Sequence, residues 1–368
     1  MSASAPHTVR LPSPRPYDAP GLFSFLAART IDGVESADLS DPSRLTYART
    51  LALPHGTGTV EVTARRRDGG GDGTETPEAA GRGTAGTHRP PPEWTLTARV
   101  CTAPEDRDEA VCRVRRLFDL DTDPRAVDSA LSADPLLAPS VHARPGLRVP
   151  GAADAEELVI RALVGRQISV AAARTHLSRL AARLGSPCDS PFAGLSRTFP
   201  TSARLAQLPA SPGRGESLDP ERPLRLPRAG IEAVRGAAKA LADGTLDLRT
   251  GAAETSDAAA LHTRLLELPG VGPWTAGYIS MRVARDPDAW LPGDVALVAG
   301  ARVLGILPAA EGRATLRDHR ELADHAERWP PWRSYAALHL WRAADEAGAG
   351  AAGPTRTVGP PRGTGQSR

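Results

Sequence analysis

The stretch LPGVGPWTAGYI, residues 268–279, is the most informative segment of this 368-residue sequence. A leucine-rich helical pattern ends at Pro269, and two glycines follow, one residue apart. Glycine permits positive φ in a tight turn and lets another molecule come close to the backbone. Pro273 stands where a second helix would begin, and proline is favoured at the first helical position because its missing N–H costs nothing there. The pattern predicts a helix, a hairpin and a second helix.

The start of that second helix would be able to bind an anion. The first N–H groups of a helix have no partner within the helix, so they bind an anionic group without any lysine. A DNA phosphate fits such a site, and the contact reads no sequence. Gly270, Gly272 and Thr275 are therefore candidate DNA-binding residues. A Gly/Pro-rich turn also joins many unrelated helices, so this stretch alone leaves a purely structural interpretation open.

Composition restricts the chemistry that the chain can perform. The net charge is only +2, so bulk charge is not the main cause of any DNA binding, and specific contacts must carry more of the affinity. Lys239 is the only lysine, which leaves one candidate for a mechanism that needs a catalytic amine. The three cysteines (Cys101, Cys112 and Cys188) form no CxxC pair, so we expect no zinc or iron–sulfur site.

Signals for a membrane or for export are missing from the sequence. No apolar run approaches the length that crosses a bilayer, and residues 1–10 contain no signal-peptide core. Widely spaced cysteines are typical of free thiols in a reducing compartment. We therefore expect a cytoplasmic protein without a membrane partner.

The first third of the chain has the pattern of a β-sheet. Valine, threonine and tyrosine alternate with polar residues in three segments, as in half-buried strands; the segments are 45–53, 60–65 and 94–101. Residues 67–93 are rich in glycine, threonine, proline and charge, and we expect them to form a disordered insertion. Residues 10–117 are thus predicted to form an N-terminal domain with an antiparallel sheet.

Helical patterns dominate from residue 154 onward. Asp154 and Glu157 have the spacing of a capping box at the start of a helix over 158–164. Further helices are predicted at 169–184, 230–242 and 258–268, with a Pro/Gly-rich insertion at 211–223 and a disordered tail at 348–368. The fold class is therefore α+β, mainly α.

Five further segments resemble one known family and occur in its order: FLAAR (25–29), LFDL (117–120), RPGLR (144–148), ISV (168–170) and WRSYA (332–336). Together with the hairpin they resemble the HhH-GPD superfamily of DNA glycosylases, and within it bacterial DNA-3-methyladenine glycosylase II. The resemblance implies a two-lobed, all-helical glycosylase core. One lobe, 151–286, would carry the helix-hairpin-helix, and the other, 118–150 with 287–347, would carry the catalytic residue.

Asp294 is the candidate catalytic residue. It follows the loop Leu291-Pro292-Gly293 and precedes an apolar helix over 295–304, and aspartate is a preferred helix N-cap. Capping alone explains the residue, but capping and catalysis are compatible. The resemblance implies that this carboxylate faces the positive charge that builds on the sugar when a nucleoside bond breaks, and that it orients the attacking water. Family members often have an acidic residue at Gly293, and an aromatic residue or leucine at Val295 and Ala296, so the pocket shape stays open.

Aromatic residues gather in the last third of the chain. Trp274 and Tyr278 lie four residues apart, so they share one face of the second hairpin helix. The resemblance implies that Trp274, Tyr278 and Trp341 form a base-binding cleft and that Phe25 lies in its wall. Such a pocket stacks on a flipped base and attracts a cationic base most. Three other aromatic residues are expected in the core instead: Trp329, Trp332 and Tyr335.

Two further expectations rest on the resemblance. Bifunctional relatives of the endonuclease III type have a lysine at the position of Trp274, where it forms a Schiff base and nicks the strand; a tryptophan cannot do this. In this family a residue in the turn before Ile168 also fills the gap that the flipped base leaves. That turn is Arg166-Gln167, so Gln167 is the candidate wedge and Arg166 a candidate DNA contact, unless both are simply solvated turn residues.

The sequence therefore predicts a monofunctional DNA glycosylase. It would hydrolyse the N-glycosidic bond of an alkylated purine of the 3-methyladenine type, flipped out of duplex DNA, as the first step of base excision repair. We expect a monomer that needs no organic cofactor, although hairpin carbonyls of the family can hold a monovalent cation. The alternatives are a non-catalytic helix-hairpin-helix DNA-binding protein, which would have no reason to keep Asp294 with the aromatic set, and a glycosylase for a deaminated or oxidised base.

Overall fold

The computed structural model describes residues 6–67, 92–213, 216–217, 219, 221–248, 258–310 and 312–348. The two segments predicted to be disordered, 67–93 and 348–368, lie outside the described residues except at their edges. Parts of the insertion at 211–223 also lie outside them.

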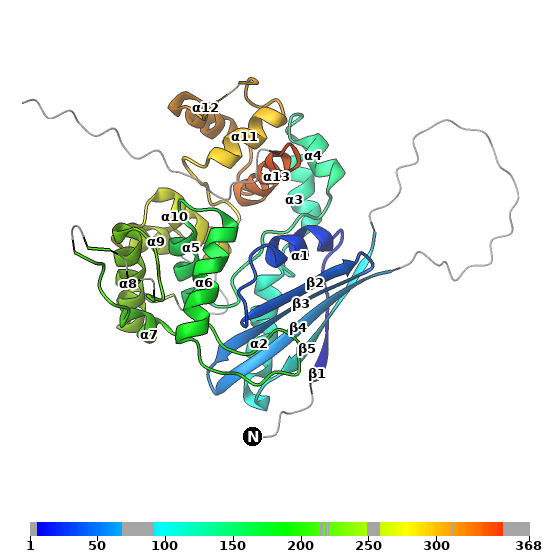
Figure 1. Ribbon diagram of the computed structural model, residues 1–368. Coiled ribbons are helices and arrows are strands. Elements are labelled where there is room, and N and C mark those ends of the chain that lie inside the picture. Colours follow the sequence, from blue (N-terminus) through cyan, green and yellow to red (C-terminus); the bar gives the residue numbers. More distant parts are fainter. Residues whose placement is uncertain are drawn as a thin grey trace, which may run out of the picture.

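The N-terminal part forms a five-stranded antiparallel sheet in the order β1-β5-β4-β3-β2 (Figure 1). The three predicted strands are β3 (Arg44–Leu53), β4 (Gly56–Arg66) and β5 (Trp94–Cys101), and they form the centre of the sheet. The prediction missed both edge strands, β1 (His7–Leu11) and β2 (Glu35–Asp41). Edge strands pair on one side only, and these two contain few apolar residues, so they have a weak period-two signal.

Two helices complete the N-terminal core: α1 (Ala19–Ala27) and α2 (Arg107–Leu117), the second preceded by the short η1 (Pro104–Asp106). Phe23 of α1 and Tyr47 of β3 both pack on Phe118, with ring centroids 5.2 and 6.0 Å from it. All three rings are buried, so this aromatic cluster joins both helices to the sheet.

The rest of the described chain is helical (Figure 1), which confirms a mainly α, α+β fold. Its elements are α3 (Pro124–Leu131), α4 (Ala138–Ala143), α5 (Ala155–Gly165), α6 (Val170–Leu184), α7 (Ser202–Ala206), α8 (Arg228–Ala242), α9 (Ala258–Leu266), α10 (Pro273–Ile279), the π-helical turn η2 (Ser280–Ala284), α11 (Val295–Val303), α12 (Leu316–Ala326) and α13 (Arg333–Glu346).

Three main hydrophobic cores underlie this arrangement. One belongs to the sheet with α1 and α2, one to α5–α10, and one to α3, α4 and α11–α13. Two residues from the N-terminal segment, Ile31 and Val34, pack in the second core, whereas Trp274 of the hairpin packs in the third. We propose that the units 10–117, 151–286, and 118–150 with 287–347 follow these cores.

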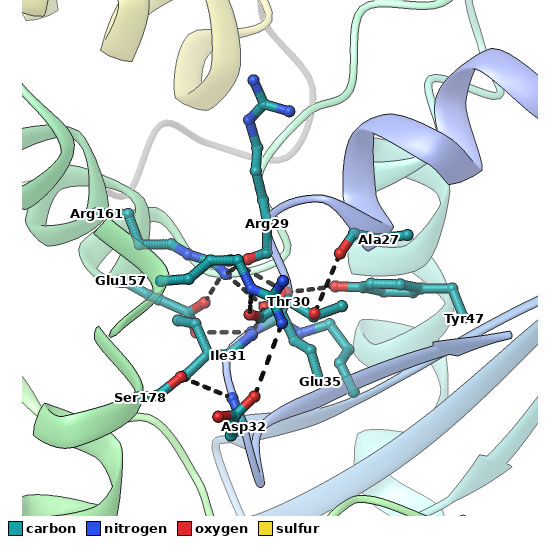
Figure 2. Close-up of polar contacts among 12 residues, drawn as sticks. Ala27, Arg29, Thr30, Ile31, Asp32, Glu35, Tyr47, Glu157, Arg161 and Ser178 are labelled. Atoms are coloured by element: carbon teal, nitrogen blue, oxygen red, sulfur yellow. Dashed lines mark hydrogen bonds and ion pairs between the residues drawn. The ribbon is translucent and has the colours of Figure 1, made fainter. Parts of the chain in front are cut away.

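A buried ion cluster joins the sheet to α5 (Figure 2). Arg49 of β3 donates to Glu157 Oε2 at 2.6 Å, and Arg161 Nη1 donates to carboxylate oxygens of both Glu157 and Glu35 at 3.0 Å. Tyr47 donates a further hydrogen bond to Glu35. Burial raises the pKa of Glu35, but Arg161 and Arg49 outweigh it and hold that pKa below its ordinary value.

The capping box predicted at the start of α5 is only half formed. Asp154 caps the helix by accepting the backbone N–H of Glu157 at 2.9 Å. The Glu157 side chain does not reach back to the cap; it enters the ion cluster, because two guanidinium groups lie beside it there.

Candidate active site

A cavity of about 610 Å³ opens where the three cores meet. Residues of the sheet domain, of α5 and α6, of the hairpin helix and of α13 all line it. The four predicted base-pocket residues are among them: Phe25, Trp274, Tyr278 and Trp341. Segments more than 300 residues apart in the sequence therefore contribute rings to one space.

The aromatic rings of this cavity form a stack. Trp274 and Tyr278 lie one above the other, with centroids 5.3 Å apart and planes only 7° from parallel. Trp341 of α13 is tilted by 54° against Tyr278 at 6.5 Å. Trp329 and Tyr335 are buried in the third core and Trp332 packs against it, as predicted. The aromatic residues are thus divided between a cavity wall and a core.

Asp294 lies behind that wall and is only 4% exposed. It caps α11: its Oδ1 accepts the backbone N–H groups of Ala296 at 2.8 Å and Leu297 at 3.1 Å. Its Oδ2 accepts the indole N–H of Trp274 at 2.8 Å and that of Trp341 at 3.3 Å. The carboxylate is therefore both a helix cap and the group that holds two rings of the cavity.

The partners of Asp294 are all neutral. Burial raises the pKa of the carboxyl group, and the indole and backbone donors act against that rise. The positive end of the α11 dipole also favours the ionised form. An anion is thus held in one orientation beside the cavity, without a cation to neutralise it. This arrangement can stabilise positive charge that develops on a bound molecule.

The two glycines of the hairpin have different surroundings. Gly270 has φ +83°, and a Cβ atom there would lie 2.8 Å from the Cβ of Ala233, so the fold itself requires glycine. Gly272 has φ −101°, and a Cβ there would meet nothing within 4 Å. Thr275 is 5% exposed, so a contact with a phosphate would use its backbone N–H.

The predicted wedge turn lies between α5 and α6. Gln167 is exposed and has φ +66°, a left-handed conformation that few non-glycine residues adopt. Arg166 makes intramolecular contacts: its guanidinium donates to the carbonyl of Gly270 and, at 3.0 Å, to that of Ala229. In this structure Arg166 therefore connects the wedge turn to the hairpin.

Comparison with known proteins identifies the family. The model of the AlkA N-terminal domain matches residues 8–71 and 76–154. DNA-3-methyladenine glycosylase 2 of Escherichia coli is 32% identical over 329 residues, which are 89% of this chain and 94% of that protein. The chain belongs to the AlkA family of DNA glycosylases.

A longer AlkA relative and two solved structures extend the comparison. A probable bifunctional transcriptional activator/DNA repair enzyme AlkA of Mycobacterium tuberculosis is 36% identical over 334 residues, 91% of this chain but 56% of the relative; the chain thus spans just over half of that protein. The 3-methyladenine DNA-glycosylase of Archaeoglobus fulgidus has a TM-score of 0.65 at 15% identity, covering 92% and 98% of the two chains. MBOgg1, solved with a low-affinity DNA ligand, has a TM-score of 0.61 at 16% sequence identity, and the match covers 95% of this chain and 98% of MBOgg1. These two structures share the fold.

Two of the arginines that line this AlkA-family pocket, Arg29 and Arg282, lie beside its aromatic rings, and sequence reasoning missed both. Arg29 follows α1, and its Cζ lies 3.7 Å from the ring centroid of Phe25. Arg282 of η2 lies 5.1 Å from the same centroid and donates to the Tyr278 hydroxyl at 2.6 Å. The motif FLAAR contained Arg29, but nothing in the sequence indicated that its side chain would lie in the cavity. The pocket is therefore aromatic and cationic at once.

Other reactive groups of the described chain lie away from this AlkA-family site. Lys239 is exposed on α8 and does not line the cavity. Within the residues that the structure describes, no group of three or more His, Cys, Asp or Glu side chains could hold a metal ion. None of the described helices combines the length and the apolar character that a membrane span requires.

Proposed function

We propose that this chain is a monofunctional DNA glycosylase that releases alkylated purines of the 3-methyladenine type from duplex DNA, in the first step of base excision repair. The observation that carries the proposal is the Asp294 carboxylate, held by the indoles of Trp274 and Trp341 beside an aromatic cavity. A protein that only binds DNA requires neither the cavity nor an uncompensated buried anion. Family membership supports the same activity.

The catalytic step uses the anion. A base flipped into the cavity stacks on Trp274, Tyr278, Trp341 or Phe25, and a cationic base gains most from these ring faces. When the bond between sugar and base breaks, its electron pair leaves with the base and positive charge develops on the sugar. Asp294 stabilises that charge, a water oxygen then bonds to the sugar carbon, and a proton is released. The products are a free base and an abasic site.

The DNA strand stays intact in this scheme. Schiff-base chemistry needs an amine at the sugar, and Trp274 occupies the hairpin position of the lysine. The only lysine, Lys239, does not line the cavity. Strand breaks should therefore appear only after alkali cleaves the abasic site.

Duplex DNA is the proposed partner. Backbone N–H groups at Gly270, Gly272 and Thr275 would hold a phosphate, and the solved DNA complex of MBOgg1 is consistent with this role for the fold. Gln167 would fill the gap left by the flipped base, because it is exposed and held in a rare backbone conformation. The carbonyl of Gly270 already accepts Arg166, so a monovalent cation would have to share that site.

We further propose a cytoplasmic monomer without an organic cofactor or a membrane partner. Cys112 and Cys188 are free thiols, which supports a reducing compartment. Hydrolysis of a cationic nucleoside needs no cofactor, because the base leaves as a neutral molecule.

The test is base release from methylated duplex DNA by the wild type and by Asp294→Asn. We expect 3-methyladenine from the wild type alone, with strand breaks only after alkali. No release by a folded, DNA-binding wild type would favour a binding protein or another lesion. Equal release by both proteins would remove Asp294 from the mechanism, and breaks without alkali would contradict the monofunctional claim.

A further inference from the structure

Arg29 is a half-buried cation that forms no ion pair with a carboxylate among the described residues. Its Nη1 donates to the carbonyl of Phe25 at 3.2 Å, its guanidinium lies over the Phe25 ring, and among the described residues it forms no ion pair. In Figure 2 its side chain points away from the ion cluster of Glu35, Glu157 and Arg161, although that cluster surrounds its backbone. The side chain lines the cavity instead.

The charged groups near Arg29 do not explain why its guanidinium lies in the cavity wall. Burial lowers its pKa to about 10, and its cationic neighbours Arg282 and Arg161 act in the same direction, so the group remains charged at neutral pH. The one carboxylate that acts on it is Asp345, which is exposed. A buried charge is costly unless it is hydrogen-bonded. In the described structure only one of the five N–H groups of Arg29 has a partner, so the others are available to a ligand.

Arg282, the other arginine beside the Phe25 ring, is anchored by the protein. It is 5% exposed, and it donates to the Tyr278 hydroxyl at 2.6 Å and to the carbonyl of Gly151 at 3.0 Å. It fixes one ring of the stack, and its Nε is buried without a hydrogen-bond partner. Of the two guanidinium groups beside Phe25, that of Arg29 is thus the one with fewer hydrogen bonds to the protein.

We propose that Arg29 is a specificity residue of this pocket: it donates hydrogen bonds to a carbonyl oxygen or ring nitrogen at the base edge, and so assists the release of neutral, oxo-bearing bases but not of cationic ones. This inference rests on the proposed function. A neutral base takes the bonding electron pair and leaves as an anion, which a nearby guanidinium stabilises without losing its proton. A cationic base leaves as a neutral molecule and gains nothing from Arg29.

The experiment compares two duplex substrates, one containing 3-methyladenine and one containing hypoxanthine, a neutral 6-oxo purine. For Arg29→Met we expect kcat/KM for hypoxanthine to fall about 10- to 100-fold, which is the loss of one hydrogen bond to a charged group. Release of 3-methyladenine should stay unchanged or rise. Arg29→Lys keeps a charged donor and should recover part of the hypoxanthine activity.

Arg174→Met is the matched control, because Arg174 also lines the cavity but is already bonded to the carbonyl of Thr30 and lies near Asp32. It should leave the ratio of the two activities unchanged. Equal losses on both substrates in Arg29→Met would mean a packing role on Phe25 and would overturn the inference. So would a wild type that releases 3-methyladenine but no hypoxanthine. A wild type that releases neither base would instead reject the proposed function.

Discussion

Two buried carboxylate sites in this molecule have opposite surroundings. Glu35 and Glu157 face the guanidinium groups of Arg49 and Arg161, so their charges are neutralised within the cluster. Asp294 is equally buried, but it accepts only from indole and backbone N–H groups. A neutralised cluster holds two parts of the fold together. An anion without a counter-charge is available to the charge that develops on a ligand.

The largest expected effect is on catalysis by Asp294→Asn. Losing the charge should lower base release by about 100- to 1000-fold, which is the scale of removing one electrostatic group that acts in the transition state. Thermal unfolding should change much less, since no cation loses its partner. Single-turnover kinetics and melting curves measure both quantities. A large loss of stability with unchanged base release would show that Asp294 is a structural residue and not a catalytic one.

The second effect is on stability, and Glu157→Gln is the variant that measures it. It leaves Arg49 and Arg161 with one anion fewer in a buried place, and breaking a buried pair in this way costs about 3–5 kcal/mol. We expect this loss in chemical denaturation, with base release by the remaining folded protein reduced far less than in Asp294→Asn. A stability change below about 1 kcal/mol would show that the cluster does not hold the sheet to α5.

The next effect is the dependence of activity and stability on pH, which should differ between Asp294 and the ion cluster. Burial raises the pKa of Asp294, so the active carboxylate should be lost, as pH falls, at a higher pH than for an ordinary aspartate. Its effect on stability has the opposite sign: a raised folded-state pKa favours the fold at low pH, and this contribution is lost as pH rises through that pKa. Glu35, with its lowered pKa, contributes stability above its unfolded pKa and loses it as pH falls.

Rates of enzymatic base release are measured across the acid range and corrected for release without enzyme. Their midpoint is the pH at which half of the Asp294 carboxylate is protonated. Binding to an undamaged duplex over the same range is the control, because no flipped-out sugar then lies beside the carboxylate. A midpoint at or below that of an ordinary aspartate would contradict the raised pKa.

The smallest effects concern the two glycines of the hairpin. Gly270 is surrounded by other protein atoms, whereas a Cβ atom at Gly272 would enter open space. Gly270→Ala should cost about 1–3 kcal/mol of stability, because φ is +83° and the new Cβ meets Ala233. Gly272→Ala should leave stability within about 0.5 kcal/mol, since its Cβ enters open space. If a phosphate approaches there, DNA affinity should fall in Gly272→Ala although its stability does not change. Unchanged affinity would reject a phosphate contact at Gly272.

Much of the site was predictable because its signals are local. The hairpin is one contiguous stretch, Trp274 and Tyr278 are one helical turn apart, and the N-cap position of Asp294 follows from its neighbours in sequence. The resemblance to glycosylases supplied the roles of these residues. The structure brings Phe25, Trp274, Tyr278 and Trp341 to one cavity, and their role in binding a base stays a prediction.

Other features were not predictable because their causes are distant in sequence. Glu157 has the spacing of a capping residue, yet Arg49, which lies 108 residues earlier, takes its carboxylate. Arg166, in a turn expected on DNA, is bonded to Gly270, which lies 104 residues later. A charged side chain is oriented by its counter-charge or hydrogen-bond acceptor, and the position of that partner depends on the tertiary fold.

The sequence by itself determined the fold class, the hairpin and the positions of the aromatic residues and the acid, since these depend on periodicity, turn chemistry and contiguous motifs. Only the tertiary structure decided which buried charges are neutralised and which are left open. That distinction depends on distances between Asp294 or Arg29 and groups brought from all three cores, and electrostatic energy in a buried site changes steeply with such distances.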